Sequence, residues 1–149
     1  MSSSVEQYPD TGYFIIMSTT SLELGSYTNI SGYLRSGHLR VFHKNPNPFT
    51  YSMTLVLSSK VGGPALSTST AIDFSDTSTG QNSTDWLIDL YFEFDDYNLI
   101  SSETYFFRLE ASGYSRSEDS VYLGVWADWL EPVGTSNTGG ARLAIGVMQ

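Results

Sequence analysis

Carboxylates in alternating segments are the residues whose types and spacing come nearest to catalysis. Asp89 and Glu93 share one face of a predicted strand, and Glu110 and Asp128 lie in two later segments of the same kind. Paired carboxylates about 5 Å or about 6.5–9.5 Å apart can hydrolyse glycosides. Arg108 occupies the same type of position, however, and ion pairs on a solvated sheet face are the commoner outcome. The pattern predicts surface ion pairs and no catalytic residue.

Other forms of catalysis lack their residues. The chain has no cysteine and no Gly-x-Ser-x-Gly motif, and its histidines are His38 and His43. Positions five apart on one strand point to opposite faces, so the two rings could not act on one substrate atom, and we expect both at the surface. The glycines at 60–64 are not followed by the Gly-Lys-Ser/Thr of a phosphate-binding loop and predict a turn. We expect a protein that is not an enzyme and has no cofactor.

Two acidic stretches, 95–98 and 118–119, raise the question of calcium. The first places Asp95, Asp96 and Asn98 directly after a predicted strand, and oxygen ligands of this kind suit Ca²⁺. Neither stretch has the spaced Asp-x-Asp-x-Asp-Gly pattern of a dedicated calcium loop, and turns favour Asp and Asn in any case. We therefore predict turns and no metal site.

The elements that must position these side chains are three alternating segments, 85–94, 105–111 and 121–129. In each one, every second residue is apolar, as a strand requires when one of its faces lies on a core. The first segment shows the pattern in Leu90 and Phe92, which alternate with polar or aromatic neighbours. These segments predict a sheet with one apolar face and one mixed face.

The rest of the chain repeats this pattern in shorter pieces. Apolar or alternating runs fall at 13–17, 21–25, 39–43, 51–58, 71–74 and 141–148. The stretch 25–37, rich in Gly, Ser, Tyr and Asn, predicts a loop or a poorly paired strand, and no segment has a 3.6-residue period. We predict an all-β, single-domain antiparallel β-sandwich of about eight strands over residues 13–149, of jelly-roll or Greek-key type, preceded by a polar arm at 1–12.

Composition bounds the partners. The 149 residues are 40% hydrophobic and 15% charged, which suits one folded domain with its own core. A net charge of −9 repels phosphate backbones, and the basic group at 38–44 is thin, so we expect no nucleic-acid partner. No apolar run approaches the roughly 20 residues of a membrane span, and the first residues lack the pattern of a signal peptide. We expect no membrane partner.

The mixed face of the three segments is the best candidate for function. It carries aromatic residues beside an arginine: Tyr91, Phe106, Arg108, Tyr122 and Trp126. A face meant only for water would not carry so many rings. Protein contact surfaces are enriched in these residue types, and such rings can also hold the C–H face of a sugar. A third possibility is that the chain covers this face itself, and the patch is split if the segments belong to different sheets.

Together these features favour a non-enzymatic structural subunit that acts by self-association or by docking in a larger assembly. A capsid-decorating, tail or fibre component of a virion, or an extracellular filament subunit, fits the description, and its partners are itself or other structural proteins. The alternative is a carbohydrate-binding module of the β-sandwich type, with a glycan as partner.

Overall fold

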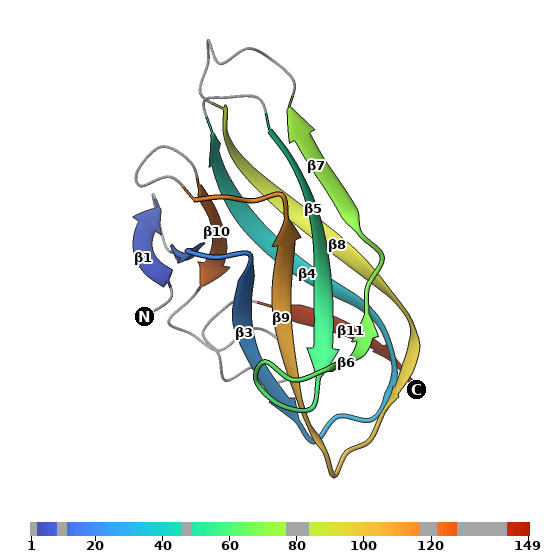
Figure 1. Cartoon of the computed structure of the whole chain (residues 1–149). Coiled ribbons are helices and arrows are strands. Elements are labelled where there is room, and N and C mark those ends of the chain that lie inside the picture. Colours follow the sequence, from blue (N-terminus) through green and yellow to red (C-terminus); the bar gives the residue numbers. More distant parts are fainter. Residues whose placement is uncertain (1–2, 9–11, 46–48, 77–83, 117–121, 128–142) are drawn as a thin grey trace.

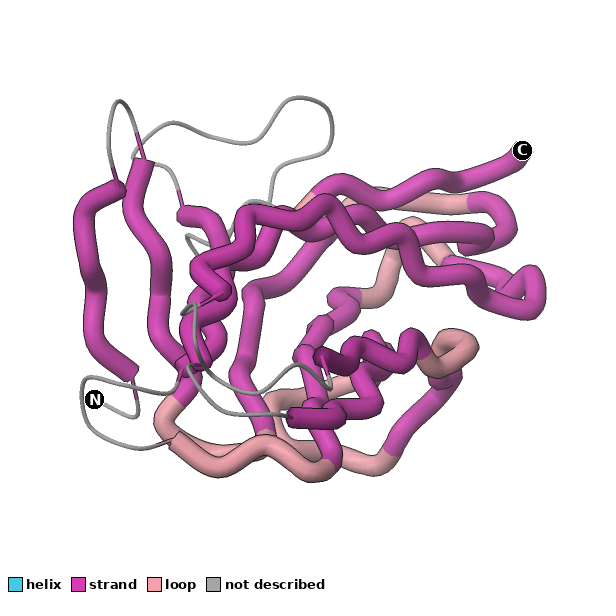
Figure 2. The backbone as a smooth tube through the Cα atoms, turned by 90° about the horizontal axis from the view of Figure 1, so that it is seen from above, coloured by secondary structure: helices cyan, strands magenta, loops and turns pink. Residues whose placement is uncertain are grey.

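A computed structural model describes residues 3–8, 12–45, 49–76, 84–116, 122–127 and 143–149. Within these residues every regular element is a strand, and Figure 2 shows strands throughout the described backbone. Two antiparallel sheets pack against each other, with β3, β9 and β5 in front of β4 and β8 in Figure 1. The predicted β-sandwich is confirmed, with eleven strands in the described residues. The jelly-roll type stays a prediction. The same residues contain no helix that is long and apolar enough to cross a membrane.

Sheet A is centred on the long strand β4. Its strands are β1 (Ser3–Tyr8), β2 (Gly12–Met17), β10 (Tyr122–Ala127), β4 (Gly32–Asn45), β11 (Ala144–Met148) and β8 (Thr84–Leu99). β8 pairs with β4 along nearly its whole length. A strand has two edges, so β10 and β11 share the other edge of β4, at 41–44 and at 33–38. β4 therefore holds the strands of this sheet together.

Sheet B is built around β5. Its strands are β3 (Ser21–Thr28), β9 (Thr104–Ser112), β5 (Phe49–Ser58), β6 (Ala65–Thr68) and β7 (Ile72–Asp76). β9 pairs with one edge of β5, and β6 and β7 pair with the other edge at 56–58 and 49–53. The three alternating segments thus fall in both sheets, because β8 and β10 belong to sheet A and β9 belongs to sheet B.

The core lies between the sheets and is formed by the apolar rows that the sequence predicts. The inward residues of β9 and β8 are all buried: Tyr105, Phe107, Leu109, Ala111, Leu90, Phe92 and Phe94. β10 adds Leu123 and Val125 to the same cluster. The hydrophobic effect of this burial is the main term that stabilises the sandwich.

Two predictions about local structure are wrong. The stretch 25–37 is not a loop, because β3 runs to Thr28 and β4 begins at Gly32 and is paired from there. Small residues suit this part of β4, since a Cβ at Gly37 would overlap with the side chain of Leu55 across the core. The polar residues at 1–12 do not form an arm without regular structure, because β1 pairs with β2 from Ser3 to Tyr8.

The flanks of the sandwich are joined by hydrogen bonds between the sheets. Beside β8, the backbone N–H of Ser69 donates to Leu55 O of sheet B (2.9 Å), and that of Thr70 donates to Glu93 O of sheet A (2.8 Å). On the opposite flank, the hydroxyl of Tyr27 donates to the carbonyl of Leu143. Such bonds satisfy backbone groups that an open flank would leave unpaired.

Candidate functional site

The structure divides the predicted aromatic patch between the two sheets. Phe106 and Arg108 lie on β9 of sheet B, and Tyr91 lies on β8 of sheet A. Tyr122 and Trp126 have their backbone in β10 of sheet A, but their side chains lie outside the described part of the structure. The predicted single patch is therefore wrong, because consecutive segments of the chain join different sheets.

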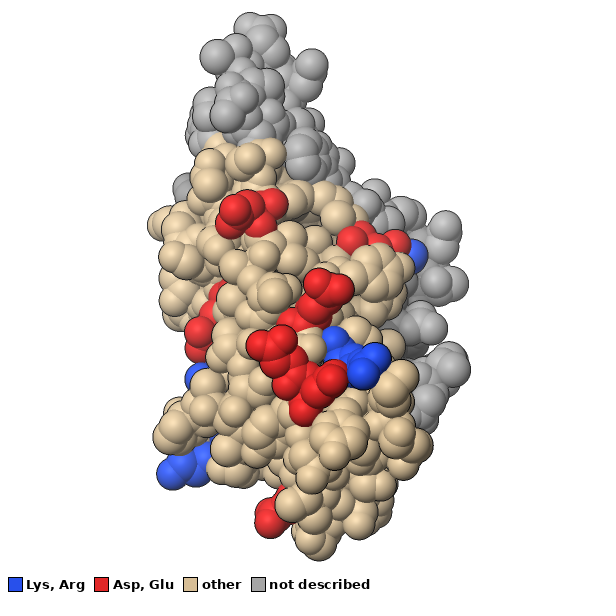
Figure 3. All heavy atoms as spheres, turned by 90° about the vertical axis from the view of Figure 1, so that its right-hand side faces the viewer, with Lys and Arg blue, Asp and Glu red and all other residues tan. Residues whose placement is uncertain are grey.

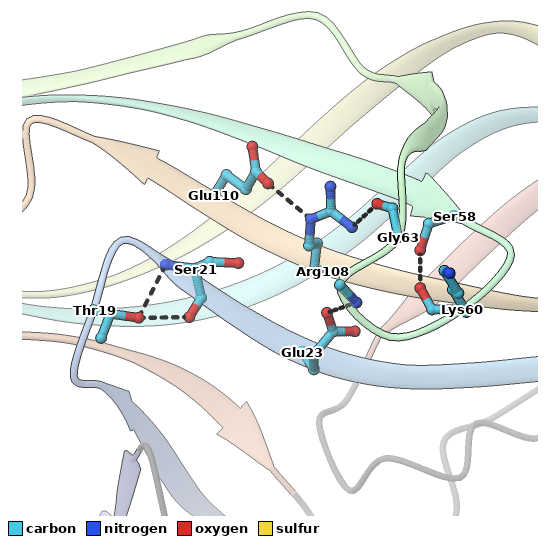
Figure 4. A network of polar contacts seen from close by, with 9 residues as sticks. Thr19, Ser21, Glu23, Ser58, Lys60, Gly63, Arg108 and Glu110 are labelled. Carbon is cyan, nitrogen blue, oxygen red and sulfur yellow. Dashed lines mark hydrogen bonds and ion pairs between the residues drawn. The ribbon is translucent and has the colours of Figure 1, made fainter.

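Arg108 is used within the chain. Its side chain is only 13% exposed, its Nε donates to Glu110 Oε2 (2.7 Å), and its Nη1 donates to Gly63 O (2.9 Å). Glu23 Oε2 accepts from the backbone N–H of Gly62 (3.1 Å), as Figure 4 shows. The expected carboxylate–arginine pair therefore forms, but the guanidinium also holds the loop at 59–64 across the outer face of sheet B. This position does not suit a partner contact, contrary to prediction.

The same loop accounts for two buried residues on the outer face of sheet B. Val56 and Ser58 alternate with inward residues of β5, yet both are buried. The hydroxyl of Ser58 donates to Lys60 O (2.6 Å), which places the start of the loop against the strand. The loop and its polar contacts are part of the fold.

Removing the Arg108 side chain tests this structural role. We expect Arg108→Ala to lower the free energy of unfolding by about 1.5–3 kcal/mol, because a charge-assisted bond to Gly63 O and the packing of the arginine stem are lost. Urea denaturation measures the change. Glu110→Gln is the matched control, since its carboxylate is half-exposed, and we expect a loss below about 1 kcal/mol. Equal losses in the two variants would contradict the role assigned to the loop contact.

The outer face of sheet A carries a cluster formed by His38, Arg40, Asp89 and Tyr91, called the Tyr91 cluster below. These residues come from β4 and β8 and are register partners, His38 with Tyr91 and Arg40 with Asp89. They alternate with buried residues of the two strands, so their side chains point away from the core. The strand pairing brings together groups that are about 50 residues apart in the sequence.

Ion pairing and ring stacking order the Tyr91 cluster. Arg40 Nε donates to Asp89 Oδ1 (2.9 Å) and Arg40 Nη2 donates to Asp89 Oδ2 (3.4 Å), a fork-like contact. His38 Nε2 lies 3.2 Å from the same Oδ1. The rings of His38 and Tyr91 are stacked, with centroids 4.4 Å apart and planes 12° from parallel. Tyr91 nevertheless remains 66% exposed, so an ordered aromatic side chain faces solvent.

The electrostatics of the cluster follow from these contacts. The hydrogen bond from Arg40 is the largest cause that lowers the pKa of Asp89, and the contact with His38 adds to it. The same bond raises the pKa of Arg40. Because the folded pKa of Asp89 is below its unfolded value, the pair stabilises the fold at neutral pH and the contribution is lost as the pH falls into the acid range. The contribution is small because the pair is partly exposed.

The same face continues along β4 and β8 towards their far ends. Arg35 Nε lies 2.9 Å from Asp96 Oδ1, at a bulge where Asp96 has a φ of 38°. Between this pair and the Tyr91 cluster, Glu93 is the register partner of Ser36. Cationic groups therefore follow β4 and carboxylates follow β8. Figure 3 shows acidic side chains gathered beside basic ones on the side of the molecule where β7 and β8 lie.

At the opposite end, the outer face of sheet A is closed. Phe42 and Ile16 are both register partners of Gly124, and all three are buried, although alternation places them on the outward side. The possibility that the chain covers its own mixed face therefore holds at this end. The open part of the face extends from Arg40 towards Tyr33.

The remaining sequence candidates do not form a site. His43 was expected at the surface but is fully buried, against the rings of Phe49 (4.0 Å between centroids), Phe74 (5.0 Å) and Tyr51 (5.6 Å). Its position two residues after Val41 on one strand was the signal for burial, since the two share a face.

The candidate carboxylates do not converge either. Asp89 and Glu93 share a face of β8 as predicted, but Glu110 lies on sheet B and Asp128 is outside the described residues. Asp96 is paired with Arg35. Among the residues that the structure describes, no three His, Asp or Glu side chains are grouped to hold a metal ion.

Comparison of the chain with protein-family models, with curated proteins and with solved structures found no match. The sequence reasoning missed His38, Arg40 and Asp89 as binding candidates. Their signal was the opposite charge of Arg40 and Asp89 on two predicted strands, which becomes a site only once the pairing of β4 with β8 is known.

Proposed function

We propose that this chain is a non-enzymatic structural subunit that acts by self-association or by docking in a larger assembly. The observation that carries the proposal is Tyr91, an aromatic side chain that is 66% exposed at the centre of an ordered cluster on a sheet face. Tyr and Arg are the residue types that contribute most to protein contacts. Side chains that are already ordered lose little conformational entropy on binding, which favours association.

The setting proposed for this subunit is a virion or an extracellular assembly, as a capsid-decorating, tail, fibre or filament component. Its partners are other copies of the chain or other structural proteins. The composition supports this setting, since a chain without cysteine folds alike in oxidising and reducing surroundings, and a net charge of −9 keeps free subunits soluble. The exposed part of sheet A is the proposed contact surface.

A carbohydrate-binding module is the second candidate, and one observation favours it. The exposed ring of Tyr91 lies beside Arg40 and Asp89, so one surface offers an aromatic plane for the C–H face of a sugar and charged groups for its hydroxyls. Both candidates place the contact on the Tyr91 cluster, and they differ in what binds there.

Light scattering of the purified chain over a range of concentrations tests the proposal. We expect a defined oligomer, and we expect Tyr91→Ala to weaken association by about 30-fold, which corresponds to a hot spot of about 2 kcal/mol. Val61→Ala is the control, because Val61 is equally exposed but lies on the loop over sheet B, and it should leave association unchanged.

A strict monomer at high concentration would contradict self-association and leave docking on a different protein as the proposed role. A glycan array then tests the second candidate. Glycan binding that Tyr91→Ala abolishes, with no change in mass, would favour the carbohydrate-binding module instead.

A further inference from the structure

We infer that the partner of the Tyr91 cluster is the same surface on a second copy of the chain, packed face to face. The two copies are related by a two-fold axis that runs parallel to β4 and β8 and between them. This inference rests on the proposed self-association and names the surface and the symmetry through which it occurs. The reason is that the charges on this face are arranged in two complementary rows.

One row is cationic and the other is anionic. β4 presents Arg35 and Arg40, with His38 between them, and β8 presents Asp89 and Asp96 at matching heights. All the charged side chains of these two pairs are between 37% and 54% exposed, so each has a free side for a further contact. A face with one row of each sign can pair with a copy of itself.

The direction of the symmetry axis follows from these rows. Rotation by 180° about an axis parallel to the strands places β4 of one copy opposite β8 of the other, at the same height. Arg40 of each copy then faces Asp89 of the other, and His38 faces Tyr91. A two-fold axis in the interface and perpendicular to the strands would place β4 against β4 and bring like charges together, which is unfavourable.

The shape of the face agrees with this packing. Sheets pack face to face at about 10 Å, a gap that large side chains must fill. Tyr91 projects from the face, and its ring would meet the His38 ring of the second copy. Glu93 would face the hydroxyl of Ser36, so no carboxylate of that register row meets another. The surplus negative charge of Glu93 and Asp95 limits the affinity of the contact.

Side-by-side pairing through β8 is the competing arrangement. The edge of β8 that faces away from β4 already accepts a hydrogen bond from the backbone N–H of Thr70 at Glu93 O (2.8 Å). Outward carboxylates along β8 would also lie near their own copies if two such edges met. Contact through the face avoids both obstacles.

Charge exchange tests the inference. We expect Arg40→Asp and Asp89→Arg each to weaken self-association by about 10-fold or more, because each creates two like-charge contacts across the axis. An equimolar mixture of the two variants should associate again to within about 3-fold of the original chain, because every contact in the mixed dimer joins opposite charges. Light scattering measures each variant alone and the mixture, at a concentration where each alone is monomeric.

The controls and outcomes separate the inference from the proposed function. Lys60→Asp and Glu103→Arg make the same changes of net charge at exposed positions elsewhere and should not alter association, while circular dichroism checks that all variants fold. Single variants that associate normally, or a mixture that stays monomeric, would overturn the inference while self-association stands. An original chain that is monomeric at every concentration would overturn both.

Discussion

Replacing Phe107 with alanine is expected to lower the free energy of unfolding by about 3–5 kcal/mol. Phe107 is fully buried at the centre of β9. Its ring meets Tyr27 edge-on at a centroid distance of 5.7 Å and Phe94 at 6.4 Å, so it contacts strands of both sheets. Truncation removes the transfer free energy of the ring and leaves a cavity that two packed sheets cannot close.

Urea denaturation at neutral pH measures this loss. Phe106→Ala is the matched control, because Phe106 is the preceding residue of the same strand, points to the opposite face and is only partly buried. We expect the control to lose less than about 1.5 kcal/mol. Comparable losses in the two variants would show that Phe107 does not occupy the core position described above.

The strands that can be predicted from the sequence are those whose pattern is local. In β9, Tyr105, Phe107 and Leu109 alternate with residues that are not buried, and this period of two is enough to identify both the strand and its inward face. The strand beginning at Phe49 shows the same pattern. The burial of apolar rows therefore required no knowledge of the pairing.

The strands that could not be predicted owe their place to partners far away in the chain. The first part of β4 has small residues because Gly37 faces Leu55 closely and Gly146 of β11 lies against Ser36. These contacts remove the apolar alternation that would identify the strand. The polar strand β1 is likewise defined by its pairing with β2 and has no pattern of its own.

The candidate site shows the same limit. Tyr91 was predicted to be exposed on a mixed face, and it is. Arg108 was predicted on the same surface, but its strand joins the other sheet, and period-two reasoning gives the face of a side chain without giving the sheet. The association of Arg40 with Asp89 depends on the register between β4 and β8, which is a property of the folded sheet.

The second large effect is expected at Tyr114, which joins the connection after β9 to sheet A. Its buried hydroxyl donates to Met17 O (2.7 Å) and accepts from the backbone N–H of Leu123 (3.1 Å). Tyr114→Phe removes both bonds and leaves two buried backbone groups without this partner. We expect the free energy of unfolding at pH 7 to fall by about 1–3 kcal/mol.

The pH dependence of this difference identifies the hydroxyl as its cause. Burial raises the pKa of Tyr114 to about 12, above the ordinary value of about 10. A folded pKa above the unfolded one means that the contribution is fully present below about pH 10 and is lost as the pH rises through about 12. The stability difference between the original chain and Tyr114→Phe should therefore narrow over this range, by up to about 2–3 kcal/mol.

Urea denaturation of both proteins between pH 9 and pH 12 measures this narrowing, and the other tyrosines cancel because both proteins contain them. Tyr33→Phe is the control, since Tyr33 is exposed and its loss should make no difference at any pH. A difference that stays constant up to pH 12 would mean that the Tyr114 hydroxyl ionises as it does in water. The bonds to Met17 and Leu123 would then not hold the sheets together at this flank, because a hydroxyl that water reaches freely loses little when it ionises.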